Sequence, residues 1–143
     1  VSDTYPKIRQ SYGSHSFPSS YLRTSRDEFW SEQRKLWYKN GRKVLPKTYI
    51  NKYFDDTSFM LWFLDDGDSY GRISTDSFSL EDIRFLQELI GNRYGIKFYI
   101  RSQSNRPNHH ILCCPKADRE YLYNIFKSLS LSIPSMLYKL KLS

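Results

Sequence analysis

The chain has 143 residues, 39% of them hydrophobic, and its 22 Lys and Arg exceed its 15 Asp and Glu to leave a net charge of +7 at pH 7. This length and composition predict one globular domain rather than a disordered chain. We expect no membrane span and no signal peptide, because every apolar run is shorter than the roughly 18 residues that a spanning helix needs. The basic balance favours a polyanionic partner such as nucleic acid.

The acidic side chains are concentrated in one short segment. Residues 55–68 contain five Asp and no Lys or Arg, whereas residues 1–54 and 69–143 each contain 11 basic residues. A basic body with one acidic spot suits a metal-dependent nuclease, because cations neutralise phosphates and carboxylates hold the metal. An acidic loop on a basic protein would have the same charge pattern, so charge alone does not decide between the two.

The two cysteines of the chain, Cys113 and Cys114, are adjacent. This spacing argues against a disulfide scaffold and favours a reducing compartment. With His109 and His110 they form the pattern HHxxCC, whose residue types suit zinc. Neighbouring side chains of a strand point to opposite faces, so these four cannot converge on one tetrahedral ion and we expect no zinc.

The first third of the chain predicts loops followed by short helices. Residues 1–24 are rich in Ser, Tyr, Pro and Gly, and we expect irregular structure there with one short strand at most. Ser25-Arg26-Asp27-Glu28 has the pattern of a capping box, and the helix that it opens is expected to end at Asn40-Gly41. The apolar side chains of that helix are Phe29, Trp30, Leu36 and Trp37. An extended piece over 43–46 and a brief helix over 47–54 follow.

The remainder of the chain alternates helices with strands. The expected elements are a helix over 56–66, a strand over 72–78, a helix over 80–94 between Ser79 and Gly95, strands over 96–101 and 109–114 around a polar turn at 103–108, a helix over 117–129 and a short helix after Pro134. This is an α+β pattern with an antiparallel sheet. Helices are expected to cover one face of the sheet and to leave the other face, which is basic and aromatic, open.

The helix over 56–66 ends in two carboxylates and a glycine, in the stretch WFLDDG. The carboxyl end of a helix is the negative end of its dipole, so an acid there is disfavoured by up to about 1 kcal/mol. Asp65 and Asp66 therefore need a reason other than the stability of the helix.

That reason is suggested by a resemblance to a known family. The stretch FMLWFLDDG resembles the second signature helix of the LAGLIDADG homing endonucleases. RKVLPK, STDSFSLED, YGIKFYI and IPSMLYKL resemble, in order and spacing, further landmarks of the two-motif, single-chain members that mobile organellar introns carry. The resemblance covers about 25–140. It implies a LAGLIDADG-type saddle, an organellar location (mitochondrion or chloroplast) and Mg²⁺-dependent cleavage of DNA in which two signature helices each supply one carboxylate.

The resemblance also implies roles for individual residues. Asp66 matches the metal ligand, and Asp65 is expected to make a helix-end or loop contact instead. Lys43 and Lys139 match basic residues near the scissile phosphates, where they would neutralise developing charge. Without the family each would simply be a solvated lysine. The residues expected to contact nucleic acid on the open face are Arg72, Ser74, Asp76, Lys97, Tyr99, Arg101 and Arg106.

Three features depart from the family pattern. The chain begins at Val1 and has no first signature helix, so we expect residues 1–54 to be the remnant of a preceding half-domain plus a linker, and 55–143 to be the LAGLIDADG-type domain. Asp66 alone cannot build a two-acid site, so the second acid must come from another chain or a second copy. Met60 and Leu61 stand where small residues let two signature helices approach. Asp76 is an acid where the family has a polar amide.

Three functions fit these observations. The first is one half of a split or truncated Mg²⁺-dependent DNA endonuclease. The second is a non-cleaving RNA-binding derivative, such as an intron maturase or an organellar ribosomal protein, because aromatics among basic residues can stack on unpaired bases. The third is a protein-interaction module. In every case we expect a second protein chain to cover the helix over 56–66, whose apolar side chains are Phe59, Met60, Trp62 and Phe63.

Overall fold

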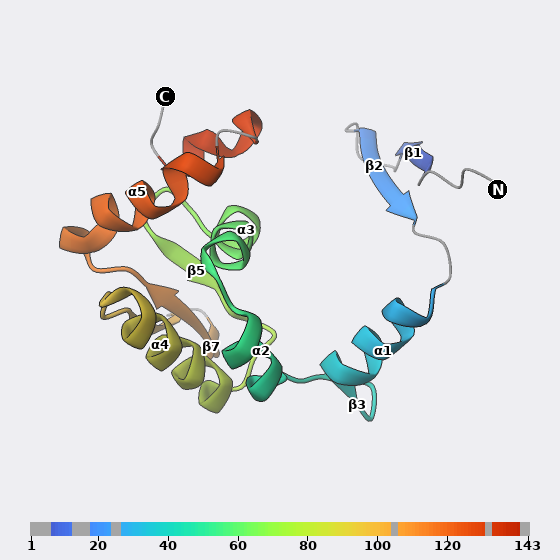
Figure 1. Ribbon diagram of the computed structural model, residues 1–143, viewed down its shortest axis with the longest axis horizontal. Helices are drawn as coiled ribbons and strands as arrows, with labels where there is room; N and C mark the ends of the chain where they lie inside the picture. The colour runs from blue at the N-terminus through green and yellow to red at the C-terminus, as the bar shows by residue number, and fades with distance from the viewer. Residues whose placement is uncertain (1–6, 13–17, 24–26, 104–105, 131–132, 141–143) are drawn as a thin grey trace.

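The computed structural model describes residues 7–12, 18–23, 27–103, 106–130 and 133–140 (Figure 1). Its elements in chain order are β1 (Lys7–Tyr12), β2 (Pro18–Arg23), α1 (Glu28–Trp37), β3 (Tyr38–Lys39), β4 (Arg42–Lys43), α2 (Lys47–Tyr53), α3 (Asp56–Asp66), β5 (Arg72–Ser74), α4 (Leu80–Tyr94), β6 (Tyr99–Gln103), β7 (Arg106–Cys113), the 3₁₀ helix η1 (Lys116–Asp118), α5 (Arg119–Ser130) and the 3₁₀ helix η2 (Pro134–Leu140). Figure 1 shows α2 to α5 gathered around a small sheet, with α1 and the β1–β2 hairpin standing apart from this body. Within the described ranges, no helix has the length and hydropathy to cross a membrane.

The N-terminal segment forms two strands, so the expectation of one strand at most was wrong. β1 and β2 pair antiparallel, with Lys7 opposite Arg23 and Tyr12 opposite Pro18. KIRQSY and PSSYLR each contain one aliphatic residue, which makes each a weak strand signal by itself. Pairing satisfies the backbone groups that each strand points toward the other, and the sequence of either segment alone does not show this pairing.

The start and the end of α1 both differ from the prediction. Its N-cap is Asp27, whose carboxylate accepts a hydrogen bond from the Phe29 amide at 2.8 Å, and Ser25 lies outside the described residues. The helix ends at Trp37, and Asn40 and Gly41, with φ of 50° and 74°, form the two-residue turn between β3 and β4. Two positive φ angles in succession are the requirement of a type I′ hairpin turn, for which Asn-Gly is the favoured pair. The helix buries no residue.

The core of the body is built on α3. Phe59 and Phe63 are fully buried, and their rings lie 5.0 and 5.5 Å from that of Phe126 on α5. The same buried cluster begins as early as Leu45 and includes Ile50 of α2. The proposed division of the chain after residue 54 therefore does not coincide with the start of the packed core.

The helices α3 and α4 match their predicted bounds because their caps are local. α3 is opened by a capping box in which the carboxylate of Asp55 accepts from the Ser58 amide and the Ser58 hydroxyl accepts from the Asp55 amide, both at 2.8 Å. α4 is opened by Ser79, which accepts from the Asp82 amide at 3.1 Å, and closed by Gly95 with φ 71°.

The sheet of the body has the order β5-β7-β6 and is antiparallel. Its strands are shorter or shifted relative to the prediction. β5 stops at Ser74 and a turn follows, closed by a 3.0 Å bond from the Phe78 amide to the Thr75 carbonyl. β6 begins at Tyr99, because its partner β7 ends at Cys113, directly opposite. β7 begins at Arg106, so the polar turn is shorter than 103–108.

The register assigns each side chain of the sheet to a face. Ile73, Leu112 and Ile100 lie side by side and point into the core, and Ile73 and Leu112 are fully buried. The residues next to them in sequence point to the opposite face. The predicted α+β class, an antiparallel sheet with helices on one face, is confirmed.

Candidate functional site

The carboxyl end of α3 presents two exposed acids, Asp65 and Asp66, and then turns sharply. Gly67 makes this turn possible, because a Cβ atom there would lie 2.3 Å from the Phe63 carbonyl oxygen. Its amide donates to that same oxygen at 2.8 Å. Any side chain at position 67 would break this helix end, which explains why a glycine follows the acids.

Lys139 of η2 caps the carboxyl end of α3. It is buried, with 9% of its surface exposed, and its ammonium donates to the backbone oxygens of Leu64 at 2.5 Å and Asp65 at 3.0 Å. A helix leaves its last carbonyl groups without partners, and a cation is favoured at its negative end. Lys139 thus offsets the electrostatic cost of placing two carboxylates there. Its predicted role beside a scissile phosphate remains a prediction, since the ammonium contacts backbone oxygens in this structure.

Replacing Lys139 by Met is expected to lower the free energy of unfolding by about 2 kcal/mol, because two carbonyl groups lose a buried, charged donor. Urea denaturation followed by circular dichroism measures this change. Lys116→Met removes an exposed lysine and serves as the matched control, expected within about 0.5 kcal/mol of the wild type. Equal midpoints for the two variants would show that the cap contributes no stability.

The amino end of α3 is held by a second contact. The Tyr94 hydroxyl of α4 donates to Asp56 Oδ1 at 2.9 Å. Burial raises the pKa of Tyr94, and the bond to Asp56 raises it further, so the phenol stays protonated at neutral pH. Side-chain hydrogen bonds therefore hold both ends of α3, the helix that carries Asp66, and its middle packs in the core.

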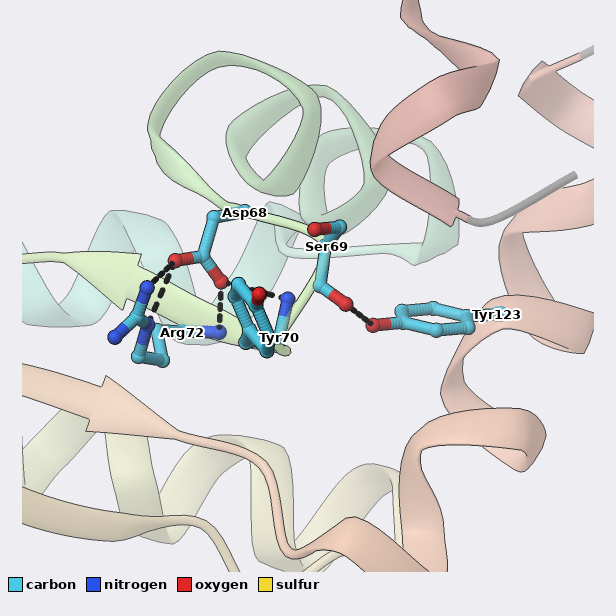
Figure 2. A network of polar contacts seen from close by, with 5 residues as sticks. All are labelled: Asp68, Ser69, Tyr70, Arg72 and Tyr123. Carbon is cyan, nitrogen blue, oxygen red and sulfur yellow. Dashed lines mark hydrogen bonds and ion pairs between the residues drawn. The ribbon is translucent and has the colours of Figure 1, made fainter. Parts of the chain in front are cut away.

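The loop after α3 is ordered by Asp68 (Figure 2). Its Oδ1 accepts from the amides of Tyr70 at 2.9 Å and Arg72 at 3.1 Å, and its Oδ2 accepts from the Arg72 guanidinium at 2.6 and 2.7 Å. Tyr123 of α5 donates to the Ser69 carbonyl at 3.1 Å. Burial would raise the pKa of Asp68, but the bonds from Arg72 and the two amides outweigh it and hold that pKa below its usual range. Arg72, a predicted nucleic-acid contact, is thus already paired with the carboxylate of Asp68.

Lys43 and Asp66 lie in the wall of one cavity of about 310 Å³. The Lys43 ammonium lies 5.0 Å from the centre of the Phe78 ring, which lines the same cavity. On α3 the lining residues Ser58, Trp62 and Asp66 follow one another at four-residue spacing and so form one stripe. Two of the three predicted catalytic residues, Lys43 and Asp66, therefore line the same cavity, and Lys139 does not line it.

The open face of the sheet carries most of the predicted nucleic-acid contacts. Arg72, Cys113 and Tyr99 form one row across the three strands, and Ser74, Ile111 and Arg101 form the next. Lys97 is exposed just before β6 on the same side as Tyr99, and Arg106 is exposed at the start of β7. Sequence reasoning missed the residues of β7 that occupy the middle of this face. The alternation of HHILCC was the available signal, but only the register shows that His109, Ile111 and Cys113 lie on this face, where Ile111 and Cys113 are buried.

Asp76 extends this face by a third row. It lies beyond the end of β5, and its Oδ1 is 3.4 Å from Nδ1 of His109, the β7 residue that precedes Ile111 on the same face. Within the described part of the chain, the buried Nδ1 atom of His109 has no hydrogen-bond partner. The acid that departs from the family pattern thus sits beside a group that becomes cationic on protonation.

The predicted apolar face of α3 is smaller than expected. Phe59, Met60 and Phe63 are buried in the core of this chain, because α5 and β5 cover them. Leu61 remains 48% exposed, and Trp62 is partly buried. Met60 therefore packs inward, and of the two bulky motif residues only Leu61 reaches the surface. The expectation that a second chain covers the helix over 56–66 stays a prediction, and Leu61 with part of Trp62 is the apolar surface of α3 left for it.

The described residues contain no group of three His, Cys, Asp or Glu side chains that could hold a metal ion. A family model described as "LAGLIDADG DNA endonuclease family" matches residues 2–122, which is most of the chain. The chain belongs to this family.

Two curated relatives are an endonuclease and a maturase. The intron-encoded endonuclease ai4 of Dictyostelium discoideum is 32% identical over 108 residues, which cover 73% of this chain and 66% of that protein. The cytochrome b mRNA maturase bI2 of Saccharomyces cerevisiae is 30% identical over 113 residues, which cover 73% of this chain and 26% of that protein. The chain therefore spans two thirds or less of each relative.

The fold agrees with that of a solved homing endonuclease. The homing endonuclease I-WcaI bound to its DNA recognition sequence superposes with a TM-score of 0.72 at 19% identity, over 96% of this chain and 64% of that one. This likeness confirms the expected LAGLIDADG fold.

Proposed function

We propose that this chain is one half of a divalent-metal-dependent DNA endonuclease, which binds duplex DNA on the open face of its sheet. The observation that carries the proposal is the exposed carboxylate of Asp66 at the end of the signature helix, in one cavity wall with Lys43. Family membership supports cleavage chemistry, and the DNA bound to I-WcaI supports the choice of ligand.

The residues at the end of α3 fit half of a Mg²⁺ site. Mg²⁺ is usually held by one or two protein carboxylates, with water and substrate phosphates as the other ligands. Asp66 supplies one carboxylate, while the carbonyl oxygens of Leu64 and Asp65 are occupied by Lys139. A bound divalent ion would polarise a phosphoryl oxygen and activate water. Lys43 would neutralise phosphate charge near Asp66.

The second carboxylate is proposed to come from a second chain or a second copy that packs along α3. The exposed Leu61, next to the half-buried Trp62, is the apolar contact available to it. We keep the division into a remnant of a preceding half-domain over 1–54 and a LAGLIDADG-type domain over 55–143 as part of this proposal. An organellar location is proposed from the intron-encoded and cytochrome b maturase relatives.

RNA binding as a maturase is the second candidate. Two of the relatives are cytochrome b mRNA maturases, from Debaryomyces hansenii and Saccharomyces cerevisiae. On the open face, Tyr99 is 46% exposed beside basic residues, where its ring could stack on an unpaired base. One binding experiment separates the two candidates.

The double variant Lys97→Ala, Arg101→Ala is expected to weaken binding of duplex DNA and to reduce the slope of log affinity against log salt by about 2, since each phosphate contact contributes about 0.9. Fluorescence anisotropy at several salt concentrations measures both, on duplex DNA and on structured RNA in parallel. The matched control is Arg84→Ala, Arg93→Ala, which removes the same charge from exposed positions of α4. Equal effects of both double variants would contradict the proposed binding face, and tighter binding of RNA would favour the maturase candidate.

A further inference from the structure

The open face carries one carboxylate in the third row of the sheet. Its presence on a surface proposed to bind DNA requires an explanation. Asp76 is exposed, and it lies on the face that presents Arg101 and Arg72. A carboxylate facing the phosphates of DNA is repelled, and this repulsion would weaken binding of every sequence alike. A carboxylate in this position is favourable where it accepts a hydrogen bond from the edge of a base.

The position of Asp76 suits contact with a base rather than with the backbone of its own chain. Its Oδ1 lies beside Nδ1 of His109, and within the described residues no hydrogen bond or other ion pair is made by its side chain. The turn that contains it is closed by backbone groups of Thr75 and Phe78. Within the described residues, the carboxylate therefore keeps its capacity to accept a hydrogen bond from a bound base.

The major groove of B-DNA is wide enough to admit a β-ribbon and presents a different pattern for each base pair, so the proposed contact is placed there. Cytosine presents an N4 amino donor there, guanine presents two acceptors, and thymine presents an acceptor and a methyl group. Adenine has a donor, but its N7 acceptor lies next to it and repels a carboxylate. We propose that Asp76, whose Oδ1 lies 3.4 Å from Nδ1 of His109, determines specificity by accepting a hydrogen bond from a cytosine amino group. This inference rests on the proposed binding of duplex DNA.

A selection experiment tests this assignment. The full chain is incubated with a pool of duplexes of randomised sequence, and the bound fraction is recovered, amplified and sequenced, with a randomised RNA pool in parallel. We compare the wild type with Asp76→Asn, Asp76→Ala and the control Glu88→Gln, which removes one acid from the exposed side of α4. All four proteins are compared at the same salt concentration.

At one position of the selected site, the wild type is expected to prefer cytosine about tenfold. Asp76→Asn is expected to prefer adenine there, because an amide can donate to N7 and accept from N6. Asp76→Ala is expected to lose the preference at that position and to keep the others. Glu88→Gln is expected to select the wild-type site unchanged.

The outcomes separate the two levels of the proposal. If the wild type selects a DNA site and both Asp76 variants select the same bases at every position, the role of Asp76 is refuted while DNA binding stands. If the wild type enriches no duplex, or enriches RNA alone, the proposed binding of DNA fails and the role of Asp76 fails with it.

Discussion

The variant Asp66→Asn is expected to lose metal-dependent DNA cleavage in the assembled endonuclease, by more than about 100-fold, while its affinity for DNA is unchanged or higher. Substitution of groups that only orient metal ligands already costs 10–100-fold, and Asp66 is the proposed ligand itself. An amide keeps the shape of the side chain but removes the negative charge that attracts the metal. The same removal reduces repulsion of phosphate, which is the reason for the higher affinity.

Asp65→Asn is the matched control for this prediction. It removes an equal charge from the neighbouring exposed residue of the same helix end. Supercoiled plasmid that carries the selected site reports cleavage, and anisotropy reports affinity. Cleavage by Asp66→Asn at the wild-type rate would exclude Asp66 as a metal ligand. If neither the wild type alone nor its assembly with a second chain that supplies the missing acid cleaves the selected site, the endonuclease proposal itself fails and a binding function remains.

The variant Phe59→Ala is expected to lower the free energy of unfolding by about 3–5 kcal/mol. Phe59 is fully buried at the centre of α3, and its ring lies 5.1 Å from that of Tyr94 and 5.0 Å, edge-on, from that of Phe126. Truncation would remove these contacts and leave a cavity that the surrounding rings cannot fill. Domains are commonly stable by 5–15 kcal/mol, so a large part of the total stability would be lost.

Leu61→Ala on the same helix is the control for Phe59→Ala. Leu61 is 48% exposed, so its truncation is expected to change the free energy of unfolding of the isolated chain by less than about 1 kcal/mol. Chemical denaturation of both variants measures the difference. Equal destabilisation would mean that α3 is not packed as described. In the assembled protein, Leu61→Ala is instead expected to weaken association with the partner that covers this side of α3.

Several parts of the fold could be predicted because their signals are local. The bounds of α3 and α4 depend on capping residues within a few positions of each helix end, and on Gly67 and Gly95. The buried positions Ile96 and Phe98 follow from alternation along the chain. The order of landmarks around FMLWFLDDG was enough to predict the LAGLIDADG family, which the family model confirms.

Other features depend on contacts between residues far apart in the chain. Lys139 reaches the end of α3 from more than 70 residues away, and Asp76 meets His109 because β7 pairs with β5 in one register. A shift of one residue in that pairing would turn every side chain of β7 to the other face. No local pattern contains this information.

By itself the sequence determined the helices with local caps, the acid at the end of α3 and the family. The tertiary structure decided which apolar residues of α3 are already buried, which lysine lines a cavity with Asp66 and which lysine caps its helix. The physical reason is that capping and periodicity act within a few residues, whereas burial, register and the meeting of charges require elements that are distant in sequence to pack together.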